Sequence, residues 1–309
     1  MAFADSSEVR VAYVPEAAYG VTPATPSFKQ LRLTGGGLST NKTTGVSNER
    51  RPDRNVSGVF ETGQDVTGDL PFELTYGSFD DIFAAALFGD WSANKLKNGK
   101  VRKSFTFEET IELGVTDAYS RFTGVMVNSL SLSISARAEV TGTFSLMGQK
   151  EALDNAPVTG ATYADPATTP ILTASANIAN FQVTGLDAGA KVRSISLQIA
   201  NNLRTRPVVG SKFSEEFGAG RCEVSGTVEL YFSSNALYQK VLDHGSGSLS
   251  FEIGIASGEK YRFTLPKLIF GNGPPQKGGN DADVMISLQV QAVFDPVTAC
   301  SVMLERAIA

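Results

Sequence analysis

Residues that commonly carry catalysis or bind metals are few and widely separated in this sequence. His244 is the only histidine, and Cys222 and Cys300 are the only cysteines. Zinc sites and Ser-His-Asp arrangements both need several such groups close together. His244 directly precedes Gly245 at the expected end of a helix, where an imidazole can interact with the terminal carbonyls. We therefore expect neither a catalytic centre nor a metal centre.

The acidic residues do not form a catalytic pattern either. Glu108 and Glu109 are adjacent in the chain, as are Glu215 and Glu216, so the side chains of each pair project in different directions. Acid–base catalysis needs two groups that face one substrate. Residues 271–283 (GNGPPQKGGNDAD) superficially look like a phosphate or calcium loop, but they lack Gly-Lys-Ser/Thr before a helix and spaced calcium ligands. The prediction is a flexible loop, with a metal site as the alternative, in a protein that is not an enzyme and has no cofactor.

Length and charge limit the organisation and the partners of the chain. It has 309 residues and a formal net charge of −5. At roughly 150 residues a domain, this length suits two domains that each bury a core. Proteins that hold nucleic acid by neutralising phosphates need a local excess of Lys and Arg. Any contact with DNA should therefore be weak.

The sequence contains no targeting signal that we recognise. Two cysteines do not form a disulfide framework, and the opening residues MAFADSSEVRV lack the basic stretch and apolar core of a secretion signal. The longest strongly apolar run, residues 82–88, is far shorter than the roughly 20 residues that span a bilayer. We predict a cytosolic product with free thiols and no transmembrane segment.

Alternation of apolar and polar residues predicts a mainly β protein. The clearest segment is 128–147, which is too long for an average strand. It is either one extended strand or two strands with a bend near Arg137 to Glu139, and we favour the bend. The same period recurs in 195–199, 224–232 and 286–294. Short helices are expected at 78–89, with Ser78 as N-cap and Gly89 as stop, and at 234–245, with Ser234 and Gly245 in those roles.

The order of segments occurs twice, which indicates a duplication. DVTG from Asp65 matches EVSG from Glu223, and each is followed by an expected helix. SFTFEETIELG from Ser104 then matches SLSFEIGIASG from Ser248. Self-similarity of this kind sets the architecture. We predict two tandem β-rich modules, each with one short helix, over 1–154 and 178–309, joined by an Ala/Thr/Pro-rich linker over 155–177.

A polar arm precedes each matched strand, at roughly 39–64 and 201–221. The first contains NERRPDRNVSG (48–58), which has no apolar run. Structureless loops beyond about 12 to 15 residues are usually functional or disordered. Such an arm cannot bury itself, but its charges can pair with a neighbour. A merely solvated loop is the alternative to such a pairing arm.

Six strings distributed over nearly the whole chain carry a resemblance to a known family. They are RVAYVPEAAYGVTP (10–23), FTGVMVNSLSLSISARAEVTGTFSLMG (122–148), SISLQIANNLRTRPVVGS (194–211), RCEVSGTVELYFSSNALYQKVL (221–242), FTLPKLIF (263–270) and DVMISLQVQAVFDP (283–296). In this order they closely resemble the tail tube proteins, or major tail proteins, of tailed bacteriophages. None is a catalytic signature. The two arms differ from each other in sequence and length.

The resemblance implies a structural virion protein that is mainly β and is made of two tandem β-sandwich or barrel modules, each with one short flanking α-helix. Its modules would form rings whose inner sheets join into a channel, and the rings would stack into the tube that guides double-stranded DNA from capsid to host. The arms would make contacts between subunits within a ring and between rings, and the residues expected to make them are Glu49, Arg50, Arg51, Asp53, Arg54, Arg204, Arg206, Lys212, Glu215 and Glu216. Single-module relatives form six-membered rings, so a duplicated chain favours three copies a ring. Six copies with one module lining the channel remain the alternative. Tail terminator and tail tip proteins are implied as partners, and the host bacterial cytoplasm as the place of synthesis.

Acids on inward strand positions would help DNA slide, because passage requires that no contact with phosphate be strong. The candidates for the channel wall are Asp65, Asp69, Glu73, Glu223 and Glu229. An outward or interface position is the alternative for each. The main rival to the whole interpretation is a monomeric β-sandwich that serves as a binding or decoration module of a phage tail or cell surface.

Overall fold

The computed structural model describes residues 4–114, 116–184 and 191–308, and it is mainly β. The first half contains η1 (Ser6–Glu8), β1 (Val9–Pro15), β2 (Ser27–Gln30), β3 (Gly37–Val46), β4 (Val59–Glu73), α1 (Asp80–Ala86), β5 (Lys95–Lys97), β6 (Phe105–Ile111), β7 (Ala118–Ser135), β8 (Thr141–Gly148) and β9 (Lys150–Asp154). It is followed by β10 (Thr162–Ala164), β11 (Ile178–Thr184), β12 (Val192–Ala200), β13 (Glu223–Tyr231), α2 (Asn235–Leu242), β14 (Ser246–Gly254), β15 (Lys260–Phe270), β16 (Pro275–Gln276), β17 (Met285–Ala292) and β18 (Met303–Glu305). The predicted β-rich class with two short helices is confirmed for the described residues.

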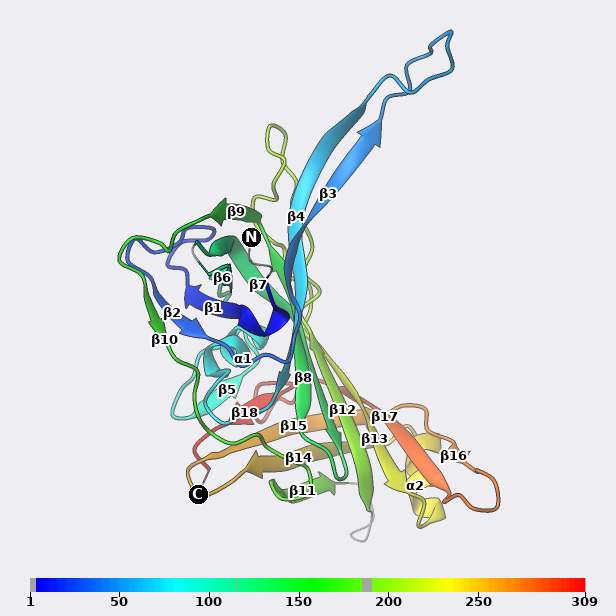
Figure 1. Cartoon of the computed structure of the whole chain (residues 1–309). Coiled ribbons are helices and arrows are strands. Elements are labelled where there is room, and N and C mark those ends of the chain that lie inside the picture. The colour runs from blue at the N-terminus through cyan, green and yellow to red at the C-terminus, as the bar shows by residue number, and fades with distance from the viewer. Residues whose placement is uncertain (1–3, 115, 185–190, 309) are drawn as a thin grey trace.

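Strands from both halves form one continuous sheet, which we call the joined sheet. Its hydrogen-bonded order is β3–β4–β8–β7–β12–β13–β17–β16. The two halves meet where β7 pairs with β12 in an antiparallel register that runs from Ser129 opposite Ala200 to Ser135 opposite Ser194 (Figure 1). This β7–β12 seam is therefore an interface between the two halves that is built from backbone hydrogen bonds.

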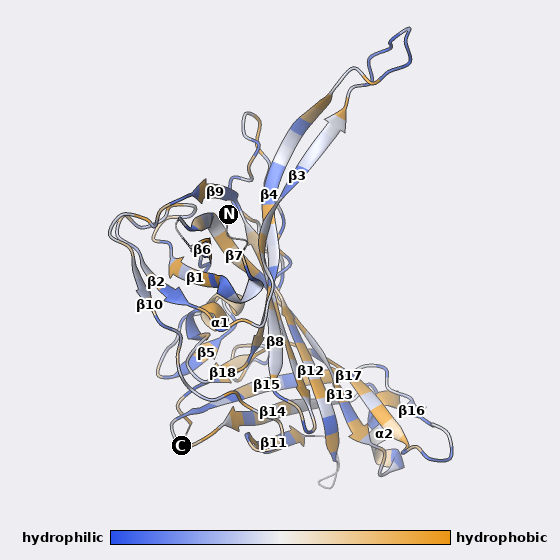
Figure 2. Cartoon of the chain, in the orientation of Figure 1, coloured by the Kyte–Doolittle hydropathy of each residue, from blue (hydrophilic) through white to orange (hydrophobic). Residues whose placement is uncertain are grey.

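Additional strands cover the other side of the core in each half. In the first half, β2, β1, β6 and the start of β7 pair in turn, and β9 adds to β7. In the second half, β11, β14, β15 and β18 pair in turn. The last strand, β18, also pairs with β5 of the first half. Figure 2 shows hydrophobic and hydrophilic residues alternating along the strands, which is typical of sheets with one buried face.

The long alternating segment is two strands with a turn at the predicted bend, and the two strands pair as an antiparallel hairpin. β7 ends at Ser135, β8 begins at Thr141, and Arg137 takes a positive φ of 65° in the turn between them. Strands β12, β13 and β17 confirm the other three alternating segments, although β13 and β17 end before Phe232 and Phe294.

The duplication is visible in the sheet register. Gly68 lies opposite Leu38 and Leu146, and Gly226 lies opposite Leu197 and Val290. A Cβ atom at either glycine would lie within 2.5 Å of a neighbouring strand's carbonyl oxygen, at 2.1 Å from Gly37 and 2.4 Å from Ser196. The repeated glycine is therefore required because two strands approach closely. By this register, β3, β4 and β8 correspond to β12, β13 and β17.

The two helices also end in the same way. In α1, the N–H groups of Phe88 and Gly89 bond to the carbonyls of Ala85 and Ala84. In α2, His244 and Gly245 bond to Val241 and Lys240 in the same pattern. Both are Schellman endings, but the left-handed residue is Phe88 (φ 48°) or His244 (φ 49°), with the glycine one position later. His244 thus ends a helix through its backbone.

One helix prediction is wrong in detail. Phe79, not Ser78, is the N-cap of α1, because the Ser78 hydroxyl lies 2.6 Å from that of Thr75. Ser234 is the N-cap of α2, as predicted. Among the described residues, no helix combines the length and apolar character needed to cross a membrane.

The segment 155–177 contacts the first half. β10 pairs in parallel with β2, and Leu172 is fully buried. One large hydrophobic cluster includes residues of both halves, such as Phe83 of α1 and Phe263 of β15. The proposed module and linker boundaries stay a prediction.

Each half contains a buried Glu–Arg ion pair at matching positions of a strand pair. Glu108 of β6 lies opposite Arg121 of β7, and Glu252 of β14 lies opposite Arg262 of β15. The Arg121 Nε donates to Glu108 at 2.6 Å, and the Arg262 Nε donates to Glu252 at 3.0 Å. Both carboxylates are at most 2% exposed. Buried charges of this kind persist only when they are paired and hydrogen-bonded.

Each buried carboxylate has one further donor. The Tyr163 hydroxyl donates to Glu108 at 2.5 Å, and the Asn180 amide donates to Glu252 at 2.8 Å. Burial acts to raise the pKa of Glu252, but hydrogen bonds from Arg262 and Asn180 outweigh burial and hold that pKa below its usual range. The pair was not predicted, although the repeated Phe-Glu in the matched strings was a signal for it.

Replacing Arg121 by Ala should strongly destabilise the fold, because it leaves the Glu108 carboxylate buried without its cation. We expect a loss of about 3 to 5 kcal/mol in the free energy of unfolding, measured by urea denaturation of the single chain. Arg193→Ala is the matched control, since Arg193 lies 3.8 Å from Glu229 with over half of its side chain exposed. The control should lose less than about 1 kcal/mol. Equal losses for the two variants would contradict the assignment.

Candidate assembly surfaces

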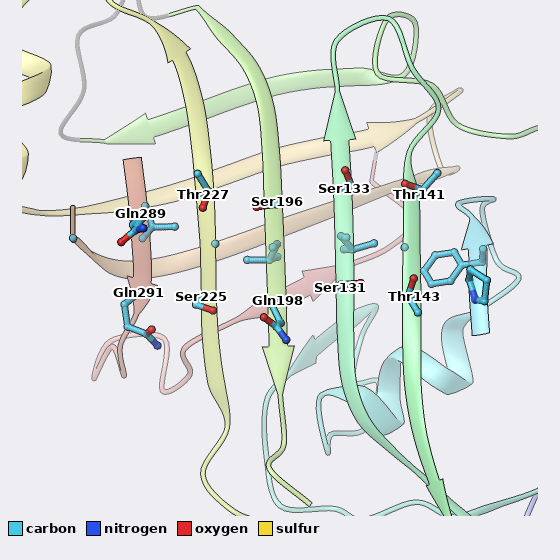
Figure 3. Close-up of a pocket in the computed structure, with 18 of the residues that line it drawn as sticks. Ser131, Ser133, Thr141, Thr143, Ser196, Gln198, Ser225, Thr227, Gln289 and Gln291 are labelled. Carbon is cyan, nitrogen blue, oxygen red and sulfur yellow. The ribbon is translucent and has the colours of Figure 1, made fainter. Parts of the chain in front are cut away.

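One face of the joined sheet is polar and almost uncharged at its centre. Its side chains come from β7, β8, β12, β13 and β17 and lie in rows across the strands (Figure 3). These residues are Ser131, Ser133, Thr141, Thr143, Ser196, Gln198, Ser225, Thr227, Gln289 and Gln291. The register explains the rows: Ser133 lies opposite both Thr141 and Ser196, and Ser196 lies opposite Thr227. The alternate residues of the same strands, such as Leu132 and Leu197, are buried in the core.

The polar face is hollowed across the seam between the halves. A cavity of about 810 Å³ lies over these rows. Its lining is rich in hydroxyl and amide groups and has no Lys, Arg, Asp or Glu, so it can hydrogen-bond to water without binding a charged ligand strongly. We call this surface the polar face.

All five predicted channel-lining acids lie on the polar face, toward its margins. Asp69 lies opposite Ser145 and Glu73 opposite Thr141, and Asp65 has the same parity on β4. Glu229 lies opposite Ser194, and Glu223 lies opposite Ala200. The structure therefore brings these acids to one side of one sheet; their exposure to a channel stays a prediction.

Most of these acids already have partners within the chain. The hydroxyls of Ser145, Ser214 and Ser194 donate to Asp69 at 2.5 Å, to Asp65 at 2.7 Å and to Glu229 at 3.1 Å. Arg221 donates to Glu223 at 2.5 Å and holds the pKa of that carboxyl below its usual range. Glu73 has no hydrogen-bond or ion-pair partner in the described part of the chain.

The first arm is a projecting β-hairpin and not the long loop that we predicted. β3 and β4 pair from Gly37 opposite Asp69 to Val46 opposite Val59, and only 47–58 lies outside the strands. Figure 1 shows this hairpin extending well beyond the body of the molecule. Sequence reasoning missed it because the hairpin strands are rich in Thr, Gly and charged residues, with little apolar alternation.

The hairpin tip combines charge with exposed apolar groups. Arg51 forms a bidentate pair with Asp53, with distances of 3.0 and 2.7 Å, and this pair holds the pKa of Asp53 far below its usual range. The side chains of Glu49, Arg50 and Arg54 are exposed and make no ion pair within the described residues. Around them, four apolar residues are more than half exposed, namely Val46, Val56, Val59 and Phe60. Exposed apolar groups beside free arginines are typical of interaction sites.

The second arm folds back onto the first half of the same chain. Phe217 is fully buried in a small cluster with Phe88 and Met126. Glu216 pairs with Arg102 at 2.9 Å and with Arg206 at 3.2 Å. The arm thus crosses the seam from the half to which it belongs and docks on the other half.

The remaining predicted residues of the second arm also lie close to the chain's own groups. Lys212 lies 3.8 Å from Glu61, Arg204 pairs through its backbone with Gly218, and the Glu215 N–H donates to the Arg206 carbonyl at 3.1 Å. The ion pairs of this arm are therefore internal. Contacts from these residues to another subunit stay a prediction.

The described surfaces are those of a β-rich protein with an open sheet and a projecting hairpin, and no group of three or more His, Cys, Asp or Glu residues in the described chain is placed to hold a metal ion. A family model described as phage tail tube protein matches residues 6–292. The chain belongs to the phage tail tube protein family, as its sequence resemblance indicated. Members of this family are structural components of the virion tail that associate with themselves into a tube. A search of curated proteins finds no match to the chain.

Replacing Phe217 by Ala should release the second arm from the first half, because the arm loses its buried anchor. Removing a buried Phe side chain costs about 3 to 5 kcal/mol. We expect trypsin to cleave after Arg204 and Lys212 much faster than in the parent chain. Val209→Ala, at a fully exposed position of the same arm, is the control and should leave the cleavage rate unchanged. Unchanged cleavage in the Phe217 variant would show that the docked arm is held by other contacts.

Proposed function

We propose that copies of this chain close into rings through the two margins of the joined sheet. The rings then stack into a tail tube that conducts double-stranded DNA during ejection. The observation that carries this proposal is the β7–β12 seam, which joins two equivalent halves edge to edge. In the described chain, β3 at one margin and β16 at the other have no further strand beside them. Sheet edges with unpaired backbone groups favour pairing with another chain.

The two margins are the counterparts of the two strands in the seam. β3 corresponds to β12. Residues 271–276 lie beside β17 in the way that the end of β7 lies beside β8, so they correspond to the part of β7 that forms the seam. Bringing β3 of one copy to residues 271–276 of another would therefore repeat an interface that the chain already contains. Repetition of this contact around an axis closes a ring and leaves no free edge.

The helices support the same arrangement. Every residue of α1 from Ile82 to Ala86 is buried, and strand β15 of the second half packs against it, with Tyr261 and Phe263 rings 5.8 and 6.3 Å from Phe83. In the described part of the chain the equivalent helix α2 is less enclosed, since Tyr238 and Val241 are only partly buried against the core and Leu242 is 60% exposed. A second copy placed by the seam geometry would cover α2 as the second half covers α1.

Sheet geometry favours three copies a ring. The joined sheet has eight strands a chain. Three copies would form a circle of about 24 strands, which at about 4.8 Å a strand has a circumference of about 115 Å and a diameter of about 37 Å. Side chains reduce this to a bore on the scale of a DNA duplex, whereas six copies would double the diameter. A six-membered ring lined by one module would also have to break the seam.

The polar face then forms the channel wall. Its centre offers neutral hydroxyl and amide groups, and its margins carry Asp65, Asp69, Glu73, Glu223 and Glu229. Neutral groups and acids bind phosphate weakly, so DNA can slide without being held. The projecting hairpin, with Glu49, Arg50, Arg51, Asp53 and Arg54, contacts other copies within a ring or in the next ring. Modules over 1–154 and 178–309 are the repeating units, with 155–177 as linker.

Tail terminator and tail tip proteins are the partners that we propose for the two ends of the tube. The chain would be made in the cytoplasm of the host bacterium and incorporated there into the virion tail. No enzymatic step is needed in this function.

Purified protein at high concentration should form rings or tubes with threefold symmetry, visible by electron microscopy, because the two free margins are complementary. Native mass spectrometry of the rings should give the mass of three chains. Six chains in each ring would refute the trimer and support the alternative ring. Uniformly small particles under all conditions would favour a monomeric binding or decoration module.

Deleting residues 45–60 should leave a folded chain that no longer polymerises, since the deletion removes the exposed hairpin tip and no buried residue. Thr44 and Glu61 lie opposite each other, so an Asn-Gly turn can reconnect them. Circular dichroism should show unchanged unfolding, and sedimentation should show only small species. A control that replaces 48–57 by Gly and Ser at equal length tests whether the tip sequence or its length matters. Normal tubes from the deletion variant would refute the role of the arm.

A further inference from the structure

The outer edge of β3 is not bare in the single chain, because a carboxylate occupies it. The N–H of Leu38 points away from β4 and donates to Glu109 Oε1 at 2.6 Å. Two residues further along β3, the Thr40 hydroxyl donates to Glu151 Oε2 at 2.5 Å. Glu109 belongs to β6 and Glu151 to β9, and neither strand pairs with β3. A side chain thus accepts the Leu38 N–H where a neighbouring strand would otherwise do so, and a second acid lies beside it on the same edge.

The second half shows what the same edge does when a strand is present. Leu197 of β12 is the counterpart of Leu38, and it lies opposite Leu132 of β7 in the seam. Both leucines are buried, with 6% and 3% of their surface exposed. The matching of Glu108 with Glu252 makes Ile253 the counterpart of Glu109. Ile253 is fully buried and cannot accept a hydrogen bond. The acid therefore occurs only at the edge that lacks a strand.

The position of Glu109 is costly for a carboxylate. Burial raises the pKa of Glu109, the Leu38 N–H opposes that shift, and the nearby Glu151 charge adds to it. The side chain is half-buried, so it can turn toward solvent if another acceptor takes the Leu38 N–H. The hydrogen bond from the Leu38 N–H to Glu109 is favourable only while no strand lies beside β3, so Glu109 can be displaced when a strand pairs there. Natural β proteins use charged residues at sheet edges to prevent edge-to-edge association.

We propose that Glu109 guards the edge of β3 in the free chain and releases Leu38 when residues 271–276 of a second copy pair with β3. This inference rests on the ring proposed above and specifies its closing contact. The occupant is a second copy, since the contact continues the established β7–β12 seam. Glu109 thereby slows unproductive pairing of single chains. When the ring closes, the Leu38 N–H exchanges the Glu109 carboxylate for a carbonyl of the second copy.

The seam also gives the register of this contact. Because Leu146 of β8 corresponds to Val290 of β17, Thr141 corresponds to Met285. Ser133 lies opposite Thr141 and Gln276 lies opposite Met285, so Gln276 is the counterpart of Ser133. Ser133 lies opposite Ser196, whose counterpart in β3 is Gly37. Gly37 of one copy therefore pairs with Gln276 of the next. Leu38 then faces Pro275, and Asn41 faces Asn272.

Pro275 can form one of the two hydrogen bonds of this pair. Its carbonyl can accept the Leu38 N–H in place of Glu109, but it has no N–H to donate to the Leu38 carbonyl, so the pair contributes one ladder hydrogen bond instead of two. Prolines within sheets are found at edges, with the nitrogen on the side away from the neighbouring strand. The outer side of β16 is such an edge in the described chain.

Replacing Glu109 by Ile, the residue of the equivalent position, should lower the critical concentration for assembly. We expect a decrease of about tenfold, which corresponds to about 1.4 kcal/mol and to the loss of one hydrogen bond to a charged group in the free chain. Glu109→Gln keeps an uncharged acceptor and should have a smaller effect. Glu112→Gln removes an exposed acid close by in the chain and is the control, with no change expected. Sedimentation of serial dilutions measures all four proteins. An unchanged or raised critical concentration for Glu109→Ile would overturn the guard.

A cross-linking experiment tests the register independently of any effect on folding. A chain with Asn41→Cys and Asn272→Cys should form disulfides between copies in assembled rings, because the two positions lie opposite each other. A chain with Asn41→Cys and Gln291→Cys is the control, since Gln291 lies one strand further in on β17 and should not link. The native Cys222 interferes little, because burial, with a contribution from Glu223, raises the pKa of its thiol to about 11.

The outcomes separate the two proposals. Rings or tubes that form without the Asn41–Asn272 link would overturn the closing contact while leaving the tube function intact. A parent chain that forms no rings or tubes would overturn the proposed function and this inference with it.

Discussion

Unpaired backbone groups at a sheet edge are the constraint on which the rest of this structure depends. Each N–H and C=O of an exposed strand must bond to water, to a side chain or to another strand. The chain satisfies this requirement once internally, where β7 pairs with β12, and that pairing merges two equivalent halves into one sheet. The outward-facing backbone groups of β3 and β16 have no neighbouring strand in the described chain. At β3, the carboxylate of Glu109 accepts one of these groups, the N–H of Leu38. The single chain therefore has a formed core, while its sheet still has two margins that can pair with another chain.

The duplication lets one interface be compared in two states. Within the chain, the second half covers α1, its arm docks through Phe217, and β12 has a strand beside it. At the free margins, α2 has an exposed Leu242, the first arm projects as a hairpin, and β3 is capped by acids. All of these differences make the free margins more polar or more exposed than the internal seam. Groups that are apolar and enclosed at the internal seam are polar or exposed where no partner is present, as a protein that must stay soluble before assembly requires.

Local sequence patterns predicted much of this fold. Alternation located the β7–β8 hairpin and its turn at Arg137, and the matched Asp65 and Glu223 strings revealed the duplication. The predictions failed where distant partners decide the structure. Ser78 binds Thr75 and so cannot cap α1, the first arm becomes a hairpin through pairing of two polar strands, and the second arm is anchored by Phe217 in a cluster with Phe88 of the other half. The five acids share one face only through the register of the joined sheet, which sequence parity within separate strands does not determine. The role of Glu109 depends on an edge that only the register reveals.

Amide hydrogen exchange in the free chain and in assembled tubes tests the central claim most directly, because exchange reports which backbone groups are bonded in each state. In segments 37–41 and 271–276, the N–H groups that point away from β4 and β17, those of Leu38, Thr40 and Gly273, should exchange faster in the free chain than in tubes, where a second copy would bond to them. Segments 129–135 and 194–200, which form the internal seam, should be protected in both states. If the two marginal segments exchange equally fast in tubes and in the free chain, the sheet is not completed by a second copy and the account is wrong.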